Sequence, residues 1–317
     1  MPFTDQRIVN SPTGAALNLY VRNADGASRG VVQINHGLAE HASRYERFAD
    51  YLAERGYTTW VHDHRGHGLT KAPGAPLGVF APAKGAEFVL RDVAFLHEEI
   101  RRQQPATPLL IFGHSMGGMI TLNAVMQHSS YLAGAAIWNS TFDTGVLGRA
   151  ALAVLAFERM RLGSDVPSRI LPKLTFQAFG KAVPNHKTLF DWLSRDQSEV
   201  DKYVADPLCG WDASVSMWRD LFAFIYFGAD DANLAKVRKD LPLMLVCGDQ
   251  DPSNNNGKAM LHLAMRLKRA NFENSHLTTY AGARHETLNE INRDEAMANF
   301  VQWADNAVER STRQRSK

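Results

Sequence analysis

The sequence predicts an α/β fold, in which a mostly parallel sheet carries helices on both faces and receives a helical insertion. Three observations lead to this fold class. Strand and helix candidates alternate through the first half of the 317-residue chain, the alternation stops between residues 139 and 239, and strand candidates return after residue 240. Alternation of this kind is typical of parallel sheets whose crossover helices cover both faces.

The first part of the predicted core is residues 1–138, and the second part is residues 240–317. Short apolar runs predict strands at 31–35, 108–112, 134–138 and 241–247, and residues 57–62 and 275–280 are also predicted to be strands. Apolar residues at helical spacing predict helices at 43–55, at 86–103 and from residue 119 onward. Strands and helices therefore follow one another as a parallel sheet requires.

A G-x-S-x-G motif occupies residues 113–117, between the strand candidate 108–112 and the helical spacing that begins at Met119. A serine at such a strand–turn–helix junction has a strained backbone conformation, and the flanking glycines avoid clashes with the strand and the helix. The context predicts that Ser115 is a nucleophile whose Oγ is exposed above the sheet. Such a serine needs a base and a group that orients the base.

Residues 139–239 form a segment much longer than a plain crossover between two strands requires. The segment is rich in large apolar side chains, among them Phe176, Trp192 and Trp218. We therefore expect a helical cap inserted over Ser115, with part of its apolar surface lining a pocket.

The acid and the histidine are expected after the last two strands, in that order along the chain. His285 lies just past the strand candidate 275–280 and is the predicted general base, and later general acid. Asp249 and Asp251 both follow the strand candidate 241–247. Asp251 is favoured because it lies farther out on the loop, where Pro252 stiffens the turn, and Asp249 remains the alternative.

Two backbone N–H groups are expected to form an oxyanion hole. One belongs to Met116, the residue after the serine, at the N-terminus of the next helix. The other belongs to Leu38, in the loop after the strand candidate 31–35, where Gly37 lets the chain pass close to a substrate.

Together these motifs resemble the monoacylglycerol lipase and bacterial lysophospholipase branch of the α/β-hydrolases, which is often grouped with the serine aminopeptidase family. The resemblance extends over roughly residues 15 to 305 and rests on HGLAEH (36–41) with Arg-Tyr at 44–45, DHRGHG (63–68), GHSMGG (113–118), GDQD (248–251) and GARHE (282–286). It implies an α/β-hydrolase fold with Ser115, Asp251 and His285 as the triad and with Leu38 and Met116 as the oxyanion donors.

The resemblance also implies a serine carboxylic-ester hydrolase that needs no cofactor and acts on monoacylglycerols, lysophospholipids or similar lipophilic esters. The peptidase name of the family has no counterpart in these residues, because no acidic cluster is arranged to hold a substrate's amino terminus. Esterase, lactonase or amidase activity on small non-lipid substrates is the alternative. A non-catalytic binding protein, or a cofactor-free lyase or perhydrolase, is a further hypothesis, since fold alone does not fix the reaction.

Composition excludes other classes of protein. A formal net charge of +2 argues against a nucleic-acid partner, which needs a strong basic field. Three histidines at 62, 64 and 67 have no further ligand cluster at suitable spacing, so no metal is predicted. The first residues carry no apolar signal-peptide region, and the longest apolar stretch, 150–157, is too short for a membrane span.

These features predict a soluble, cytoplasmic protein with both cysteines, Cys209 and Cys247, reduced. The apolar cap makes transient contact with a membrane or micelle a hypothesis, which co-sedimentation with liposomes can test. The sequence makes no prediction of the oligomeric state.

Overall fold

The computed structural model describes residues 3, 5–142 and 145–315. Its centre is an eight-stranded sheet in the order β1-β2-β4-β3-β5-β6-β7-β8. The strands are β1 (Asp5–Asn10), β2 (Ala16–Arg22), β3 (Gly30–Asn35), β4 (Tyr57–His62), β5 (Leu109–His114), β6 (Leu132–Trp138), β7 (Leu243–Gly248) and β8 (Ser275–Tyr280). Strands β3 to β8 run parallel to one another, which confirms the mostly parallel sheet.

The antiparallel pair at the N-terminal edge was not predicted. Strand β1 pairs with β2, and β2 pairs with β4, both antiparallel. The hairpin turns through Gly14, whose φ of 84° lies in the left-handed region that glycine adopts without strain. In β2 the apolar residues Leu17, Leu19 and Val21 alternate with more polar ones, so the sequence did carry the period of two that indicates a strand.

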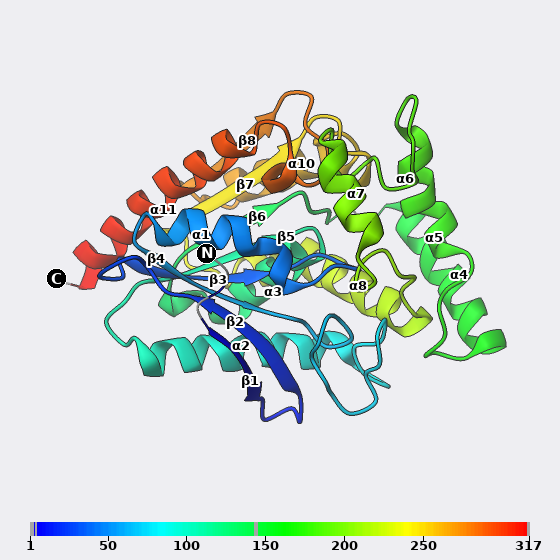
Figure 1. Ribbon diagram of the computed structural model, residues 1–317, viewed down its shortest axis with the longest axis horizontal. Coiled ribbons are helices and arrows are strands. Elements are labelled where there is room, and N and C mark those ends of the chain that lie inside the picture. Colours follow the sequence, from blue (N-terminus) through cyan, green and yellow to red (C-terminus); the bar gives the residue numbers. More distant parts are fainter. Residues whose placement is uncertain (1–2, 4, 143–144, 316–317) are drawn as a thin grey trace.

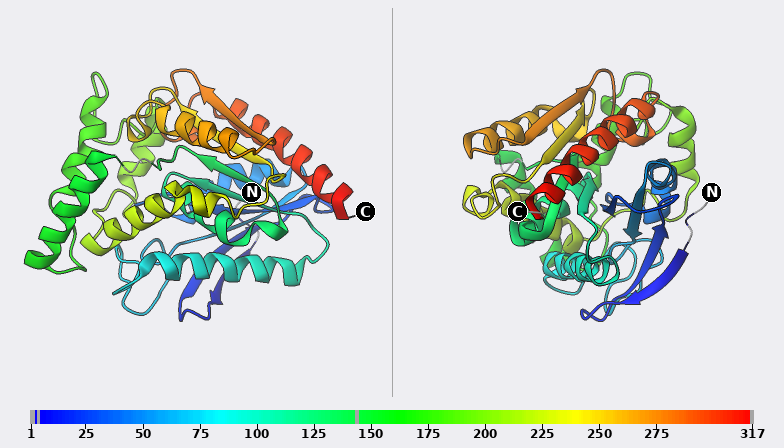
Figure 2. Two further views of the ribbon diagram at one scale, coloured as in Figure 1. Left: turned by 180° about the vertical axis from the view of Figure 1, so that it is seen from behind. Right: turned by 90° about the vertical axis from the view of Figure 1, so that its left-hand side faces the viewer.

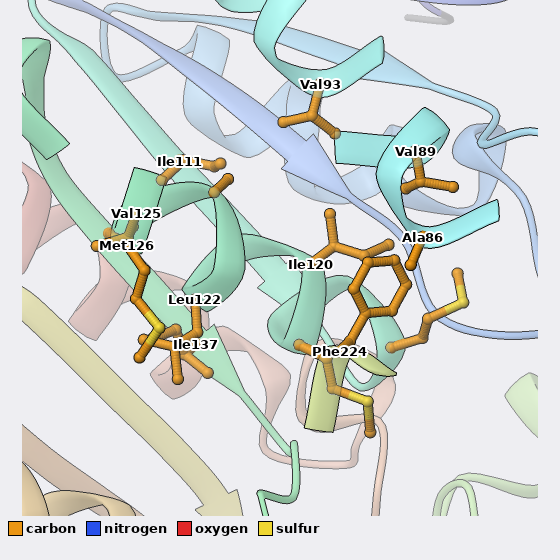
Figure 3. Packing of buried hydrophobic residues seen from close by; sticks show 14 of the residues in the cluster. Ala86, Val89, Val93, Ile111, Ile120, Leu122, Val125, Met126, Ile137 and Phe224 are labelled. Carbon is orange, nitrogen blue, oxygen red and sulfur yellow. The ribbon is translucent and has the colours of Figure 1, made fainter. Parts of the chain in front are cut away.

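Helices cover both faces of the sheet, as Figure 1 and the two views of Figure 2 show. Because side chains alternate along a strand, successive residues of β5 enter opposite layers. Ile111 belongs to a buried layer to which α2 (Gly85–Gln103), α3 (Met116–His128), α8 (Val215–Ala229) and α10 (Lys258–Arg269) also contribute. Phe112 packs on the other face, with α1 (Glu46–Ala53) and α11 (Arg293–Arg315). Figure 3 shows part of the first layer, in which Ile111 of β5 lies between residues of α2, such as Val93, and residues of α3, such as Val125.

In the described part of the predicted cap, residues 139–142 and 145–239, the structure has α8 and five further helices. These are α4 (Val146–Leu162), α5 (Leu171–Leu174), α6 (Phe176–Ala182), α7 (Gln197–Ala205) and α9 (Asp231–Leu234). Helices α4 to α7 lie beyond the carboxyl ends of the parallel strands, to the right in Figure 1. Helix α8 differs from them, because Phe224 inserts into the core layer beside α2 and α3 (Figure 3).

Five buried histidines lie in or beside the core: His36, His62, His64, His67 and His97. The rings of the first three are neighbours, with centroids 4.5 Å apart for His36–His64 and for His62–His64. Burial lowers the pKa of His36 to about 4 and the pKa values of His62, His67 and His97 to about 3, and it lowers that of His64 as well. All five therefore stay neutral in the folded protein at neutral pH.

We expect this cluster to make the protein acid-sensitive. The unfolded chain takes up protons on these histidines below about pH 6.5 while the folded chain does not, so their contribution to stability is complete above that pH and is lost as the pH falls. Each one lowers the free energy of unfolding by up to about 1.4 kcal/mol per pH unit. Among the described residues, three groups act in the opposite direction: burial raises the pKa of Asp220 to about 6 and also that of Asp212, and the hydrogen bond and charge of Glu40 outweigh burial to raise that of His114.

Urea unfolding at pH 7, 6 and 5 measures this loss. Neither ring nitrogen of His62 has a hydrogen-bond partner among the described residues, so His62→Phe removes one titrating group without leaving a broken bond. This variant is expected to reduce the pH slope by about 1.4 kcal/mol per unit. His262→Phe, at an exposed position, is the matched control. Equal slopes for His62→Phe and the wild type would contradict the expectation.

Candidate active site

Ser115 lies at the sharp turn between β5 and α3 and has φ 57° and ψ −118°, a conformation that costs free energy for a residue with a side chain. The neighbouring glycines make this turn sterically feasible. A Cβ at Gly113 would lie 2.0 Å from the carbonyl oxygen of Gly117, and a Cβ at Gly117 would lie 1.9 Å from that of Asn35. The Ser115 N–H donates to the Trp138 carbonyl at 2.9 Å, which ties the turn to β6.

Asp251 and His285 are in direct contact. His285 Nδ1 lies 2.8 Å from Asp251 Oδ2, and both side chains are buried. Burial raises the pKa of the Asp251 carboxyl, but His285 and the hydrogen bonds from Ser253 and Asn139 lower it further, so the net pKa is below its usual range. Asp251 is thus held as a carboxylate next to the imidazole.

Asp249, the alternative acid, points elsewhere. Its Oδ1 accepts a hydrogen bond from the Gly282 N–H at 2.7 Å. This is the usual role of a loop aspartate that satisfies a nearby backbone donor. The structure places Asp251, rather than Asp249, against His285.

The ring of His285 is fixed on several sides. With Nδ1 facing Asp251, Nε2 is the nitrogen left for a reacting group. Ser253 Oγ lies 2.9 Å from the same Nδ1 and donates to Asp251 Oδ1 at 2.7 Å. The indole of Trp192 packs on the imidazole with ring centroids 4.7 Å apart. The backbone N–H of His285 also donates to the Trp192 carbonyl at 3.3 Å.

The two predicted oxyanion donors lie beside Ser115. Leu38, Ser115 and Met116 line one cavity, and Met116 is the first residue of α3. No acceptor for either N–H is recorded within the part of the chain that the structure describes. The arrangement therefore offers two unpaired donors and a helix N-terminus where negative charge would develop on a carbonyl oxygen.

The cavity that Ser115 opens into has a volume of about 650 Å³. Side chains of α4, α5, α6 and α8 form most of its wall, including Val154, Leu171, Phe179, Leu221 and Ile225. None of the described residues that line it is charged. A pocket of this kind favours apolar ligands.

A second cavity of about 210 Å³ adjoins the first, since Thr141 and Ser253 line both. Its other lining residues are largely polar and include Asn254, Lys258 and His262. The two cavities thus place an apolar and a polar compartment next to each other near Ser115.

Reasoning from the sequence missed several residues around the Asp251–His285 pair. Ser253 follows Asp251 by two positions, the spacing at which an aspartate carboxylate accepts a hydrogen bond from the backbone N–H two residues on, so a local signal was present. Asn139 and Trp192 gave no such signal. They are far from Asp251 and His285 in sequence and reach them only through the fold.

Within the described residues, the ligand atoms of one group of metal-ligating type, His41, Asp206 and Cys209, lie within 4.8 Å of one another. His41 Nε2 already lies 2.7 Å from Asp206 Oδ2, so the group forms a hydrogen-bonded contact between the loop after β3 and the end of α7. Cys209 and Cys247 are both free and buried. No helix in the described part of the chain is long and apolar enough to cross a membrane.

Comparison with known proteins places these features in a family. A family model described as "Serine aminopeptidase, S33" matches residues 26–292. Monoglyceride lipase from Mus musculus is 25% identical over 292 residues, covering 92% of this chain and 86% of the lipase. Monoacylglycerol lipase from Mycolicibacterium smegmatis is 26% identical over 302 residues, covering 88% and 89%.

Solved structures share the fold. A thermostable carboxyl esterase from Bacillus coagulans in complex with glycerol superposes with a TM-score of 0.86 at 24% identity, covering 97% of this chain and 99% of the esterase. A soluble variant of monoglyceride lipase from Saccharomyces cerevisiae, in complex with a substrate analogue, superposes with a TM-score of 0.75 at 19% identity, covering 97% and 95%.

Proposed function

The chain belongs to the serine aminopeptidase S33 family of α/β-hydrolases, and we propose that it is a serine hydrolase of lipophilic carboxylic esters, monoacylglycerols above all. The observation that carries the proposal is the uncharged cavity of about 650 Å³ that opens at Ser115. An acyl chain fits such surroundings, whereas the charged amino terminus of a peptide has no described partner there.

The proposed acylation step uses the residues around Ser115. His285 Nε2 takes the proton from Ser115 Oγ, and Oγ bonds to the ester carbonyl carbon. Asp251 keeps the proton of His285 on Nδ1 and stabilises the imidazolium. The N–H groups of Leu38 and Met116 bind the carbonyl oxygen as it becomes an oxyanion, each contributing roughly 3–4 kcal/mol to transition-state stabilisation. The C–O bond then breaks, and the alcohol leaves with the proton from His285.

Deacylation repeats these steps with water in place of Ser115. His285 takes a proton from the water, whose oxygen bonds to the acyl carbon, and the released Ser115 Oγ regains the proton. The products are a carboxylic acid and an alcohol. The polar cavity beside Ser253 supports departure of a hydroxylated or charged head group on that side, with Lys258 and His262 on its wall. A lysophospholipid is the related substrate class that this wall could accommodate.

We expect hydrolysis of p-nitrophenyl esters to improve with acyl length until the cavity is filled. Each methylene that enters the cavity contributes roughly 0.8 kcal/mol, which is about a fourfold gain in kcat/KM if it acts in the transition state. The measurement is kcat/KM from acetate to palmitate, with a monoacylglycerol of the optimal length assayed alongside.

Two substitutions on α4 provide a test of where the acyl chain lies. Val154 lines the cavity, so Val154→Phe should move the optimum to shorter esters. Phe157 is 49% exposed on the same helix, so Phe157→Leu should leave the profile unchanged. An optimum at acetate would favour the small-ester alternative. A folded wild-type protein inactive on every ester would refute the proposal.

A further inference from the structure

The guanidinium of Arg44 lies between two buried carboxylates, Glu40 and Glu286. Its Nη1 donates to Glu40, and its Nη1 and Nη2 bind Glu286 at 2.7 and 2.8 Å as a bidentate pair. Side-chain exposure is 13% for Arg44 and 5% for each carboxylate. Burial raises the pKa of Glu286, but the charge and hydrogen bonds of Arg44 lower it further, so the net pKa is below its usual range and all three groups stay charged.

Glu40 connects this cluster to the loop that carries Leu38. The Gly37 N–H donates to Glu40 Oε1, and the Tyr45 hydroxyl donates to the same oxygen at 2.9 Å. The Gly37 bond fixes the peptide plane that immediately precedes the one donating the Leu38 N–H. The orientation of that N–H therefore depends on where the Glu40 carboxylate is held.

Glu286 connects the cluster to the general base, because it directly follows His285. A second connection runs through His114, whose Nε2 donates to the His285 carbonyl at 3.0 Å. His114 Nδ1 lies 3.5 Å from Glu40 Oε1. Burial lowers the pKa of His114, but the hydrogen bond and charge of Glu40 outweigh this, so its net pKa is raised. His114 also directly precedes Ser115.

One buried cluster therefore contacts the loop of Leu38, the turn of Ser115 and the loop of His285. Neither Arg44 nor its two carboxylate partners line the cavity at Ser115. Their influence on a reaction must pass through the groups that they hold.

We propose that Arg44 is a positioning residue. Through Glu40 and Glu286 it holds the Leu38 N–H and the His285 imidazole in the relative positions that the transition state requires. The inference rests on the proposed function. Since ester binding depends on the apolar cavity, loss of this register should lower kcat and leave KM nearly unchanged.

Because the cluster is charged, its variants should shift the pH profile of kcat/KM. A purely structural role of Arg44 would leave this profile unchanged. Arg44→Gln leaves two carboxylates near His285 without their cation, which favours the imidazolium, so the acid limb of the kcat/KM profile should move to higher pH. Glu286→Gln removes one negative charge, so the limb should move to lower pH. Arg44→Lys keeps the charge but loses the bidentate geometry, so the limb should return toward its wild-type position while kcat stays low.

The experiment measures kcat, KM and the pH profile of these three variants with the optimal p-nitrophenyl ester, and folding by circular dichroism. We expect kcat to fall roughly tenfold or more in Arg44→Gln, with KM within about twofold. The matched control is Arg22→Lys, because the side chain of Arg22 is 9% exposed and also binds two carboxylates, Asp25 and Asp50, at the end of β2. This control should retain wild-type kinetics.

Folded variants with unshifted acid limbs would overturn the inference, as would a kcat within twofold of the wild type. If Arg44→Gln does not fold, the opposite shift in Glu286→Gln still decides the question. Failure of the proposed function is a different result, since the wild-type protein itself would then be inactive on every ester.

Discussion

Ser115→Ala is expected to abolish ester hydrolysis, with kcat falling by roughly 10⁴-fold or more. The substitution removes the only atom proposed to bond to the acyl carbon, while the unpaired N–H groups of Leu38 and Met116 remain. The residual rate would then be that of water attack assisted by the oxyanion hole. Steady-state hydrolysis of the optimal p-nitrophenyl ester measures the loss.

Labelling with a fluorophosphonate gives a second measurement, because the wild-type protein should be modified at one site and the variant should not. Ser140→Ala is a suitable control. Ser140 Oγ donates to the Ser115 carbonyl at 2.7 Å but does not line the cavity. A Ser115→Ala protein that keeps more than about one hundredth of the wild-type kcat would mean that another group is the nucleophile.

Asp251→Asn is expected to lower kcat by about 10⁴-fold, the loss seen when the acid of such a triad becomes an amide that favours the wrong histidine tautomer. Asp249→Asn should retain most activity, since the Asp249 carboxylate accepts a hydrogen bond from the Gly282 N–H, whereas the carboxylate of Asp251 faces His285. The two substitutions are chemically identical and two residues apart, so each controls for the other.

Measuring the folding of both variants shows whether a loss of activity reflects the lost carboxylate or a loss of structure. The native state holds Asp251 with a lowered pKa, so its carboxylate contributes stability above the unfolded value near 3.9, and that contribution is lost as the pH falls. At neutral pH both variants should be folded by circular dichroism. A larger loss of kcat in Asp249→Asn than in Asp251→Asn would reverse the assignment of the acid.

Local motifs made the fold and the turn at Ser115 predictable. A glycine is sterically required at Gly113 and at Gly117, so the motif itself carries the conformation of the turn. The parallel strands β3 to β7 are buried on both faces, and most of them appear as apolar runs, whereas the edge strand β8 is only partly buried. The β1–β2 hairpin was missed although Leu17, Leu19 and Val21 alternate with more polar residues along β2.

The surroundings of His285 were beyond sequence reasoning. Arg44 and Glu286 form an ion pair although they are 242 residues apart in the sequence. No local pattern predicts that a single guanidinium binds two carboxylates. The choice between Asp249 and Asp251 stayed open for a related reason. Both follow the same strand, and only the tertiary position of the loop after β8 brings one of them to the imidazole.

The packing of Trp192 on His285 has an optical consequence. The two rings are 4.7 Å apart between centroids and tilted by 41°. A protonated imidazole quenches the emission of an indole in contact with it, whereas a neutral imidazole quenches far less. Because the chain carries six tryptophans, the emission of Trp192 is the difference between the wild-type protein and a Trp192→Phe variant. This difference should follow the charge of His285, the proposed general base, in the resting protein without a substrate.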